Sequence, residues 1–158
     1  MTTIYTDGSA RGNPGPGGWG AIIASNTKVE EIGGGEKHTT NNRMELKAAI
    51  RALESLEPTG EKITVYTDSQ YVMKGITEWI HNWVVKNWKT AGKKPVENQD
   101  LWQALLKNTE DRDIEWKYVA GHSGHAANDR CDEIATSFAD GVDPNLYNGK
   151  RDNYRISL

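Results

Sequence analysis

Two short segments of this sequence, far apart along the chain, have nearly the same residues in the same order. Positions 4–9 read Ile-Tyr-Thr-Asp-Gly-Ser, and positions 65–70 read Val-Tyr-Thr-Asp-Ser-Gln. Each is a β-branched and aromatic run that ends at an aspartate, which is typical of a short strand followed by a turn. If the two strands are parallel neighbours, about 4.8 Å apart, Asp7 and Asp68 lie side by side at one end of a sheet.

Two carboxylates so close together share either a proton or a cation. Hard oxygen ligands favour Mg²⁺ or Mn²⁺ over softer metals. Each aspartate also has an ordinary structural interpretation, because Asp often caps the turn or helix that follows a strand. The repeated segment leaves both interpretations open for this pair.

The rest of the chain alternates between short strands and helices. Three early strands separated by turn residues predict an antiparallel meander, and the later elements predict an α/β fold with a mixed sheet and helices packed on its faces. Apolar periodicity and turn signals place the strands at 3–6, 19–24, 29–33, 63–67 and 114–119, and the helices over 46–56, 76–84, 100–107 and 131–138.

The chain has the length of a single domain with a substantial core, at 158 residues. We expect this domain to cover residues 1–141, because the sequence turns polar after Gly141 and predicts a loosely ordered tail at 142–158. No apolar run suits a membrane span, the first residues lack a basic and then apolar segment, and the lone Cys131 offers neither a disulfide nor a zinc site. These features predict a cytoplasmic monomer.

The net charge of −3, taken alone, counts against nonspecific binding to nucleic acid. Its distribution is more informative, because the stretch from Tyr71 to Pro95 holds five lysines and one acid, Glu78. A basic stretch beside an acidic centre suits a polyanion that is held by one region and cut, through metals, by the other.

Two further acids have good structural explanations. Asn42 and Glu45 have capping-box spacing, with Asn42 as N-cap and Glu45 reaching back to its amide, and spacing alone favours this cap over a carboxylate aimed at the strand ends. Asp132 lies near the start of the last helix with Asp129 and Glu133, where any acid is favourable beside the positive end of the helix dipole. The sequence pattern alone does not show which of Asp129, Asp132 and Glu133 has a functional role.

Five blocks of sequence are informative when they are taken together. They are Thr6–Ser9, Gly12–Gly18, Thr40–Glu45, Thr67–Val72 and Gly121–His125. In this order and spacing, over about residues 1–140, they resemble bacterial type 1 ribonuclease H, and although each block is weak by itself, the five together are very specific. The resemblance implies a ribonuclease H-like α/β fold with a five-stranded mixed sheet, in which the first three strands are antiparallel, the others run parallel to the first, and helices lie on both faces.

The resemblance also implies an enzyme, an endonuclease that hydrolyses the RNA strand of RNA/DNA hybrids and leaves 5′-phosphate and 3′-hydroxyl ends. Carried over residue by residue, its carboxylates are Asp7, Glu45, Asp68 and Asp132, which would hold two Mg²⁺ ions about 3.5 to 4 Å apart, with Mn²⁺ as a possible substitute. His122 matches a histidine that assists the water or the departing product. Its structural alternative is a loop histidine bonded to backbone.

The resemblance further implies how a hybrid is held. Asn13 and Thr40 match a phosphate pocket for the DNA strand, and Asn41 and Gln70 match contacts to sugars and phosphates, although a glycine- and proline-rich run at 12–20 is ordinarily just a hairpin turn. The 2′-hydroxyl distinguishes the strand that is cut. Contacts to the DNA strand and a basic protrusion are implied for Trp79, Lys86, Trp88, Lys89, Lys93 and Lys94.

The protrusion departs from the more basic versions found in the family. Trp79 and Trp83 have core spacing, so at least one of them is expected to pack. Val84 and Val85 stand where lysines often occur, and Glu97 adds a negative charge, which predicts weaker hybrid binding with a shallower salt dependence.

Two other functions compete with hybrid cleavage. A related carboxylate nuclease acting on DNA would normally need extra DNA-binding or multimerisation segments, for which 158 residues leave little space. A hybrid-binding module that has lost catalysis should lack at least one of the four acids, and this sequence has all of them.

Overall fold

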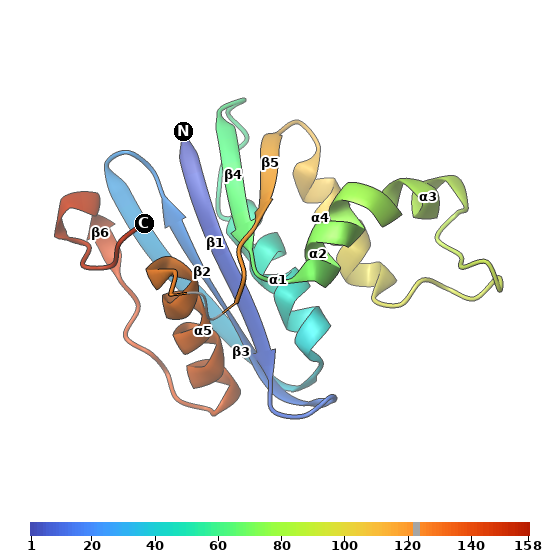
Figure 1. The fold of residues 1–158 in the computed structure, drawn as a ribbon, viewed down its shortest axis with the longest axis horizontal. Coiled ribbons are helices and arrows are strands. Elements are labelled where there is room, and N and C mark those ends of the chain that lie inside the picture. Colours follow the sequence, from blue (N-terminus) through green and yellow to red (C-terminus); the bar gives the residue numbers. More distant parts are fainter. Residues whose placement is uncertain (122–123) are drawn as a thin grey trace.

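Strand β1 (Thr2–Ala10) lies at the centre of the sheet, between an antiparallel and a parallel neighbour (Figure 1). Short turns lead from β1 to β2 (Gly15–Ala24) and on to β3 (Lys28–Thr39), and strands joined in this way pair antiparallel. β4 (Lys62–Thr67) and β5 (Asp113–Tyr118) follow helical crossovers and run parallel to β1. The predicted mixed α/β sheet is therefore confirmed.

The computed structural model describes residues 1–121 and 124–158. The helical spacing predicted over 76–84 corresponds to a π-helical turn, η1, followed by α3. No helix in the described part of the chain combines the length and the apolar character that crossing a bilayer requires. The helical elements are α1 (Asn41–Glu54), α2 (Gln70–Lys74), η1 (Gly75–Trp79), α3 (Ile80–Val85), α4 (Gln99–Thr109), α5 (Ala126–Ala139) and the 3₁₀ turn η2 (Arg151–Asn153).

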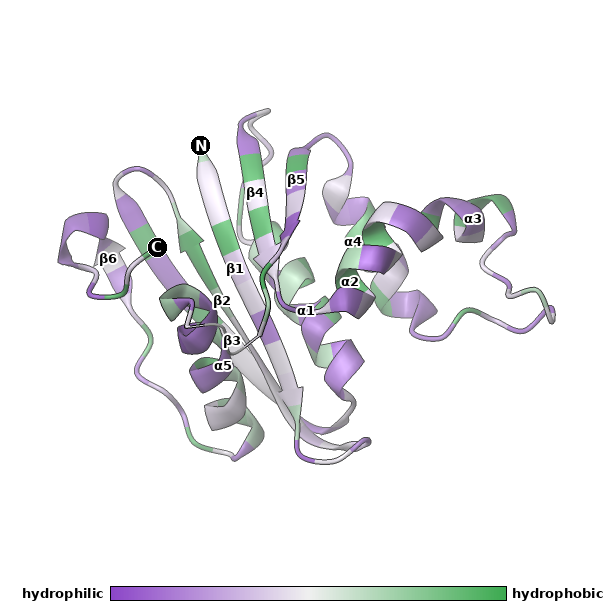
Figure 2. Ribbon diagram, viewed as in Figure 1, coloured by the Kyte–Doolittle hydropathy of each residue, from purple (hydrophilic) through white to green (hydrophobic). Residues whose placement is uncertain are grey.

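The two faces of the sheet bury neighbouring residues of the same strands, because successive side chains of a strand point in opposite directions. Ile4 lies in one core with Leu46 of α1 and Trp102 of α4. Tyr5, the next residue, lies in another with Cys131 of α5. Figure 2 shows the corresponding hydrophobic bands along the central strands. Helices on both faces were predicted, and the structure confirms them.

Helix α5 lies unusually close to the sheet because glycine replaces larger residues beneath it. A Cβ atom added to Gly18 of β2 would lie only 2.1 Å from the carbonyl oxygen of Ala135. Any side chain at this position would push the helix away. The glycine-rich sequence of β2 therefore allows the close contact between α5 and β2.

Helix α1 begins earlier than the sequence suggested. Its N-cap is Thr40, whose Oγ1 accepts a hydrogen bond from the Arg43 amide at 3.2 Å. The predicted capping box, with Asn42 as N-cap and Glu45 as its partner, is therefore wrong. Asn42 already lies inside the helix, and the Glu45 carboxylate is free of any capping role.

The C-terminal segment departs from the loosely ordered tail expected at 142–158. Residues Asn148–Lys150 form a sixth strand, β6, which pairs antiparallel with the outer edge of β3, so the sheet order is β5-β4-β1-β2-β3-β6. The five-stranded count was therefore one strand short. Tyr147 and Tyr154 pack against the α5 core, and polar composition did not reveal this because the segment is held by specific long-range hydrogen bonds.

Candidate functional site

The repeated segments of the sequence are neighbouring parallel strands. Tyr5 pairs with Tyr66 and Thr6 with Thr67 in the register of β1 and β4. Asp7 and Asp68 are the next residues along, so their predicted juxtaposition is confirmed. Only β4 ends there, at Thr67, because β1 continues past Asp7 to Ala10. The carboxylate of Asp7 also accepts a hydrogen bond from the Gly8 amide at 2.8 Å, which orients it.

Glu45 comes close to Asp7 and Asp68 because α1 lies directly on β1. A Cβ atom at Gly8 would lie 2.3 Å from the backbone of Met44 and of Glu45. Only glycine allows such a close approach between the helix and the strand. A glycine after an aspartate is typical of a turn, so the local sequence does not reveal the role of Gly8 in placing Glu45.

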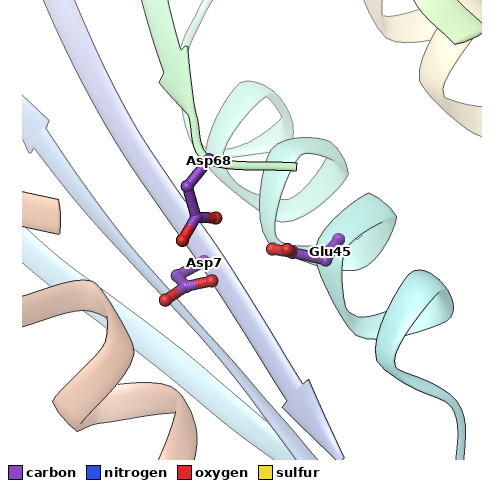
Figure 3. A group of neighbouring side chains, drawn as sticks. All are labelled: Asp7, Glu45 and Asp68. Carbon is purple, nitrogen blue, oxygen red and sulfur yellow. The ribbon is translucent and has the colours of Figure 1, made fainter. Parts of the chain in front are cut away.

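Asp7, Glu45 and Asp68 form one acidic cluster, drawn in Figure 3. One carboxylate oxygen from each lies within 4.8 Å of the others. Asp7 and Glu45 are buried, and within residues 1–121 and 124–158 neither Glu45 Oε1 nor Asp68 Oδ1 has a hydrogen-bond partner. Buried, unpartnered carboxylate oxygens are costly in an empty site and are hard ligands for a divalent cation. The three residues therefore fit a metal ion.

Burial and mutual repulsion disfavour the charged forms of these acids. Burial, followed by the neighbouring charge of Asp68, raises the pKa of Asp7 to about 8. Burial and the charges of Asp7 and Asp68 raise the pKa of Glu45 well above its ordinary value. A bound cation would reverse this preference, because it stabilises carboxylates in their charged form.

Asp132 lies on α5, at the edge of this cluster rather than inside it. Its carboxylate is half-buried and lies outside the group of three defined above. Its charge nevertheless contributes to the raised pKa of Asp7, so the two residues lie on the same side of the sheet end. Packing of α5 on β1 and β2 provides this proximity.

His122 lies outside the residues that the structure describes. The neighbouring Gly121 does contact the cluster, since a Cβ atom there would lie 3.2 Å from Asp68 Oδ2. His125, for which we expected a surface or structural role, is the N-cap of α5, and its Nδ1 accepts a hydrogen bond from the Asn128 amide at 3.4 Å.

The residues expected at a phosphate pocket lie together. The Asn41 amide donates to Asn13 Oδ1 at 3.1 Å, and Thr40 is the N-cap beside it. Asn13 and Asn41 are exposed, so their remaining polar atoms face solvent. Gln70 is exposed at the first position of α2, two residues after Asp68.

The predicted protrusion extends from one side of the sheet, as α3 and the loop that follows it (Figure 1). Its four lysines are exposed, and none belongs to an ion pair within residues 1–121 and 124–158. The last part of α3 is hydrophobic (Figure 2), and Val85 is 84% exposed. The lysines are Lys86, Lys89, Lys93 and Lys94.

The tryptophans of this region divide between packing and exposure. Trp79 is 37% exposed, whereas Trp83 and Trp88 are half-buried and pack against the α1 and α4 core. The prediction that at least one of Trp79 and Trp83 packs is confirmed. Trp88, expected at the substrate surface, instead has its ring 6.0 Å from that of Trp83.

Hydrogen bonds that the sequence did not predict connect α1 with the base of the protrusion. Arg43 donates to both carboxylate oxygens of Asp100, at 3.0 and 2.8 Å, and to Asn98 Oδ1 at 3.3 Å. Asn98 and Trp102 in turn donate to the Tyr71 hydroxyl, at 3.1 and 2.9 Å. These residues are far apart in the sequence, so no local pattern predicts the network.

Known proteins resemble this chain in both sequence and fold. A family model described as RNase H matches residues 1–140. The Ribonuclease H of Hahella chejuensis is 60% identical over 132 residues, which are 84% of this chain and 88% of that protein. LC9-RNase H1, described as a type 1 RNase H with the type 2 active-site motif, has a TM-score of 0.81 at 32% identity, covering 94% of this chain and 77% of its own.

LC11-RNase H1, whose structure was solved in complex with RNA/DNA hybrid, has a TM-score of 0.69 at 25% identity, covering 89% of this chain and 98% of its own. The family match includes every strand and helix that carries the acidic cluster. Because this match spans most of the chain, and a bacterial relative shares more than half of the aligned residues, the chain belongs to the bacterial RNase H family of endoribonucleases.

Proposed function

We propose that this chain hydrolyses the RNA strand of RNA/DNA hybrids with two divalent cations and leaves 5′-phosphate and 3′-hydroxyl ends. The observation that carries the proposal is the convergence of Asp7, Glu45 and Asp68 within 4.8 Å. LC11-RNase H1, which has the same fold, was solved with a hybrid bound, and this supports the same class of substrate.

We assign Mg²⁺ to the cluster, with Mn²⁺ as a substitute, because all the donors are hard carboxylate oxygens. Asp132 is assigned as the fourth ligand, since α5 holds it close enough to influence Asp7. Bound cations would neutralise charge that develops on the phosphodiester and make hydroxide available near neutral pH.

The protein's own contribution is mainly position. Asp7 and Asp68 are fixed by the register of two buried strands, and Glu45 by the contact of α1 with Gly8. The scissile phosphate must therefore approach the C-terminal end of β4, beside which these acids lie. Asp132 is half-exposed and would close the site from the α5 side. We assign His122 to proton transfer with the attacking water or to departure of the product.

The surface around the cluster supports a grip on both strands. Asn13, Thr40 and Asn41 lie together and offer polar groups for a phosphate of the DNA strand, and Gln70 lies close to Asp68 along the chain. Recognition of the RNA strand would rest on its 2′-hydroxyls.

The protrusion would add an electrostatic grip on the DNA strand. Trp79 offers an exposed ring, and the lysines at 86, 89, 93 and 94 offer charge to phosphates without reading bases. Trp88 would support this surface from beneath, since it is half-buried.

The decisive experiment compares an RNA/DNA hybrid, duplex DNA and duplex RNA as substrates, each with Mg²⁺, with Mn²⁺ and with chelator. We expect cleavage of the RNA strand in the hybrid alone, and none with chelator. End-labelled products would reveal the 5′-phosphate and 3′-hydroxyl ends. Binding of the hybrid without metal-dependent cleavage would contradict the proposal and favour a binding module, and cleavage of duplex DNA would favour the related DNA nuclease.

A further inference from the structure

Glu31 is a deeply buried carboxylate that does not belong to the acidic cluster. It lies on β3, and its side chain is only 2% exposed. Arg130 donates to both of its oxygens, through Nε and Nη2, at 2.9 Å each. The Tyr147 amide donates to it at 2.9 Å and the Tyr154 hydroxyl at 2.6 Å. Four donors from two other parts of the chain therefore meet on one carboxylate.

These bonds keep Glu31 charged despite its burial. Burial acts to raise its pKa, but the hydrogen bonds from Arg130, Tyr154 and the Tyr147 amide outweigh burial and lower the pKa. The Arg130 side chain is itself only 14% exposed. A buried ion pair of this kind is strongly destabilised when one partner is removed, because the other charge is left without compensation.

Arg130 connects the buried Glu31 carboxylate to Asp132, at the edge of the acidic cluster. It lies on α5, two residues before Asp132, and it also donates to the Asn145 carbonyl at 2.8 Å. The same turn of α5 is therefore tied to β3 and to the C-terminal segment. The ion pair at the far end of the helix, between Arg11 and Asp140, is about half exposed and holds the helix less firmly.

We propose that Glu31 and Tyr154 are positioning residues for Asp132, so that the C-terminal segment acts on metal binding through Arg130 and the first turns of α5. The inference rests on the proposed function, in which Asp132 is a metal ligand. Neither residue belongs to the acidic cluster or to the surface that we assign to the substrate. Both act by holding one arginine, and with it the helix that places Asp132 beside Asp7.

Two tyrosines of the C-terminal segment provide a matched test. Tyr154→Phe removes one hydrogen bond to Glu31, whereas Tyr147→Phe removes a hydroxyl that donates to the Lys150 carbonyl and leaves the Tyr147 amide bond to Glu31 intact. For Tyr154→Phe we expect the Mg²⁺ concentration for half-maximal rate to rise about three- to tenfold and kcat to fall by a similar factor, with KM for the hybrid unchanged. Tyr147→Phe should match the wild type.

A second variant and a second measurement complete the test. Glu31→Gln should show the same changes with larger size, because Arg130 then loses its buried charged partner and keeps only Glu133, whose side chain is exposed. Mg²⁺ titration of the free proteins, followed by NMR, should show weaker binding for Tyr154→Phe than for Tyr147→Phe. If Tyr154→Phe lowers thermal stability while kcat and both Mg²⁺ measurements match the wild type, the positioning role is overturned, even if Glu31→Gln fails to fold.

The two proposals fail in different ways. A wild-type protein that does not cut hybrids would overturn the proposed function. The NMR titration does not depend on cleavage, so equal Mg²⁺ binding by the two tyrosine variants would overturn the positioning role alone.

Discussion

The acidic cluster and the protrusion differ in how firmly the protein holds their side chains. The cluster is set by strand register and by a helix packed against Gly8, so its atoms have little freedom to move. The protrusion ends in exposed lysines on a loop whose backbone enters the left-handed region at Asn87, Trp88 and Lys93. Chemistry at a phosphodiester needs groups held in place, whereas attraction between lysines and phosphates needs only charge and reach.

This contrast predicts that substitutions in the cluster act on kcat by orders of magnitude, whereas substitutions in the protrusion act modestly on KM. The strongest test is Asp7→Asn, which keeps the size of the side chain and removes a ligand. We expect hybrid cleavage to fall by about 1000-fold or more, because several kcal/mol of charge stabilisation is lost. Single-turnover cleavage measures it. Asp140→Asn, an exposed acid at the end of α5, is the control and should keep nearly full activity.

His122 should have a smaller effect, because we assign it to assist rather than to bind metal. His122→Ala should lose about 100-fold in kcat and keep measurable activity, as is usual when one acid–base group is removed. The exposed His38 provides the control substitution. Equal and complete losses for His122→Ala and Asp7→Asn would contradict this division of roles.

Proton binding by the cluster predicts a pH effect on stability when no metal is bound. The folded protein holds a proton on Asp7 up to about pH 8, whereas an ordinary aspartate in the unfolded chain releases it near pH 4. The folded state then binds more protons, so stability falls as pH rises between these values. Near pH 8 with chelator, Asp7→Asn should exceed the wild type by about 2 kcal/mol in free energy of unfolding.

Urea unfolding of both proteins, near pH 5 and near pH 8, measures this difference. We expect it to shrink near pH 5, where Asp7 is protonated in the folded protein. Addition of Mg²⁺ near pH 8 should also reduce it, because the cation stabilises the charged carboxylates of the wild type. A wild type whose stability rises steadily with pH in chelator would exclude this account of the cluster.

The smallest effect is expected at the protrusion. Lysines at the exposed positions Val84 and Val85 should lower KM for the hybrid several-fold at low salt and steepen its logarithmic salt dependence by roughly 1 to 2. Val142→Lys places one added lysine on an exposed residue of the C-terminal segment and should change neither quantity. An unchanged salt slope in the double lysine variant would show that these positions do not face the hybrid.

Most of the fold could be predicted from patterns among residues close together in the sequence. Alternating and helical apolar patterns predicted the three antiparallel strands, the two later strands and the main helices. The family resemblance implied that the later strands run parallel to the first. The repeated segment at 4–9 and 65–70 predicted both the pairing of β1 with β4 and the meeting of Asp7 with Asp68, because two strands with equivalent ends place them at the same edge.

The placement of the remaining groups was decided by long-range contacts. Capping-box spacing favoured Asn42 and Glu45, yet Thr40 caps the helix and Glu45 is buried against β1. The polar residues at 142–158 predicted a loose tail, yet the buried charge of Glu31 and the free edge of β3 hold this segment in place.

The sequence by itself determined the order and type of the elements, because strand and helix patterns depend on residues within a few positions of one another. Only the tertiary structure decided that Glu45 joins Asp7 and Asp68, since burial and close approach depend on what packs from elsewhere, as α1 does on Gly8. The pKa of Asp7 is a property of that packing, and no local pattern contains it.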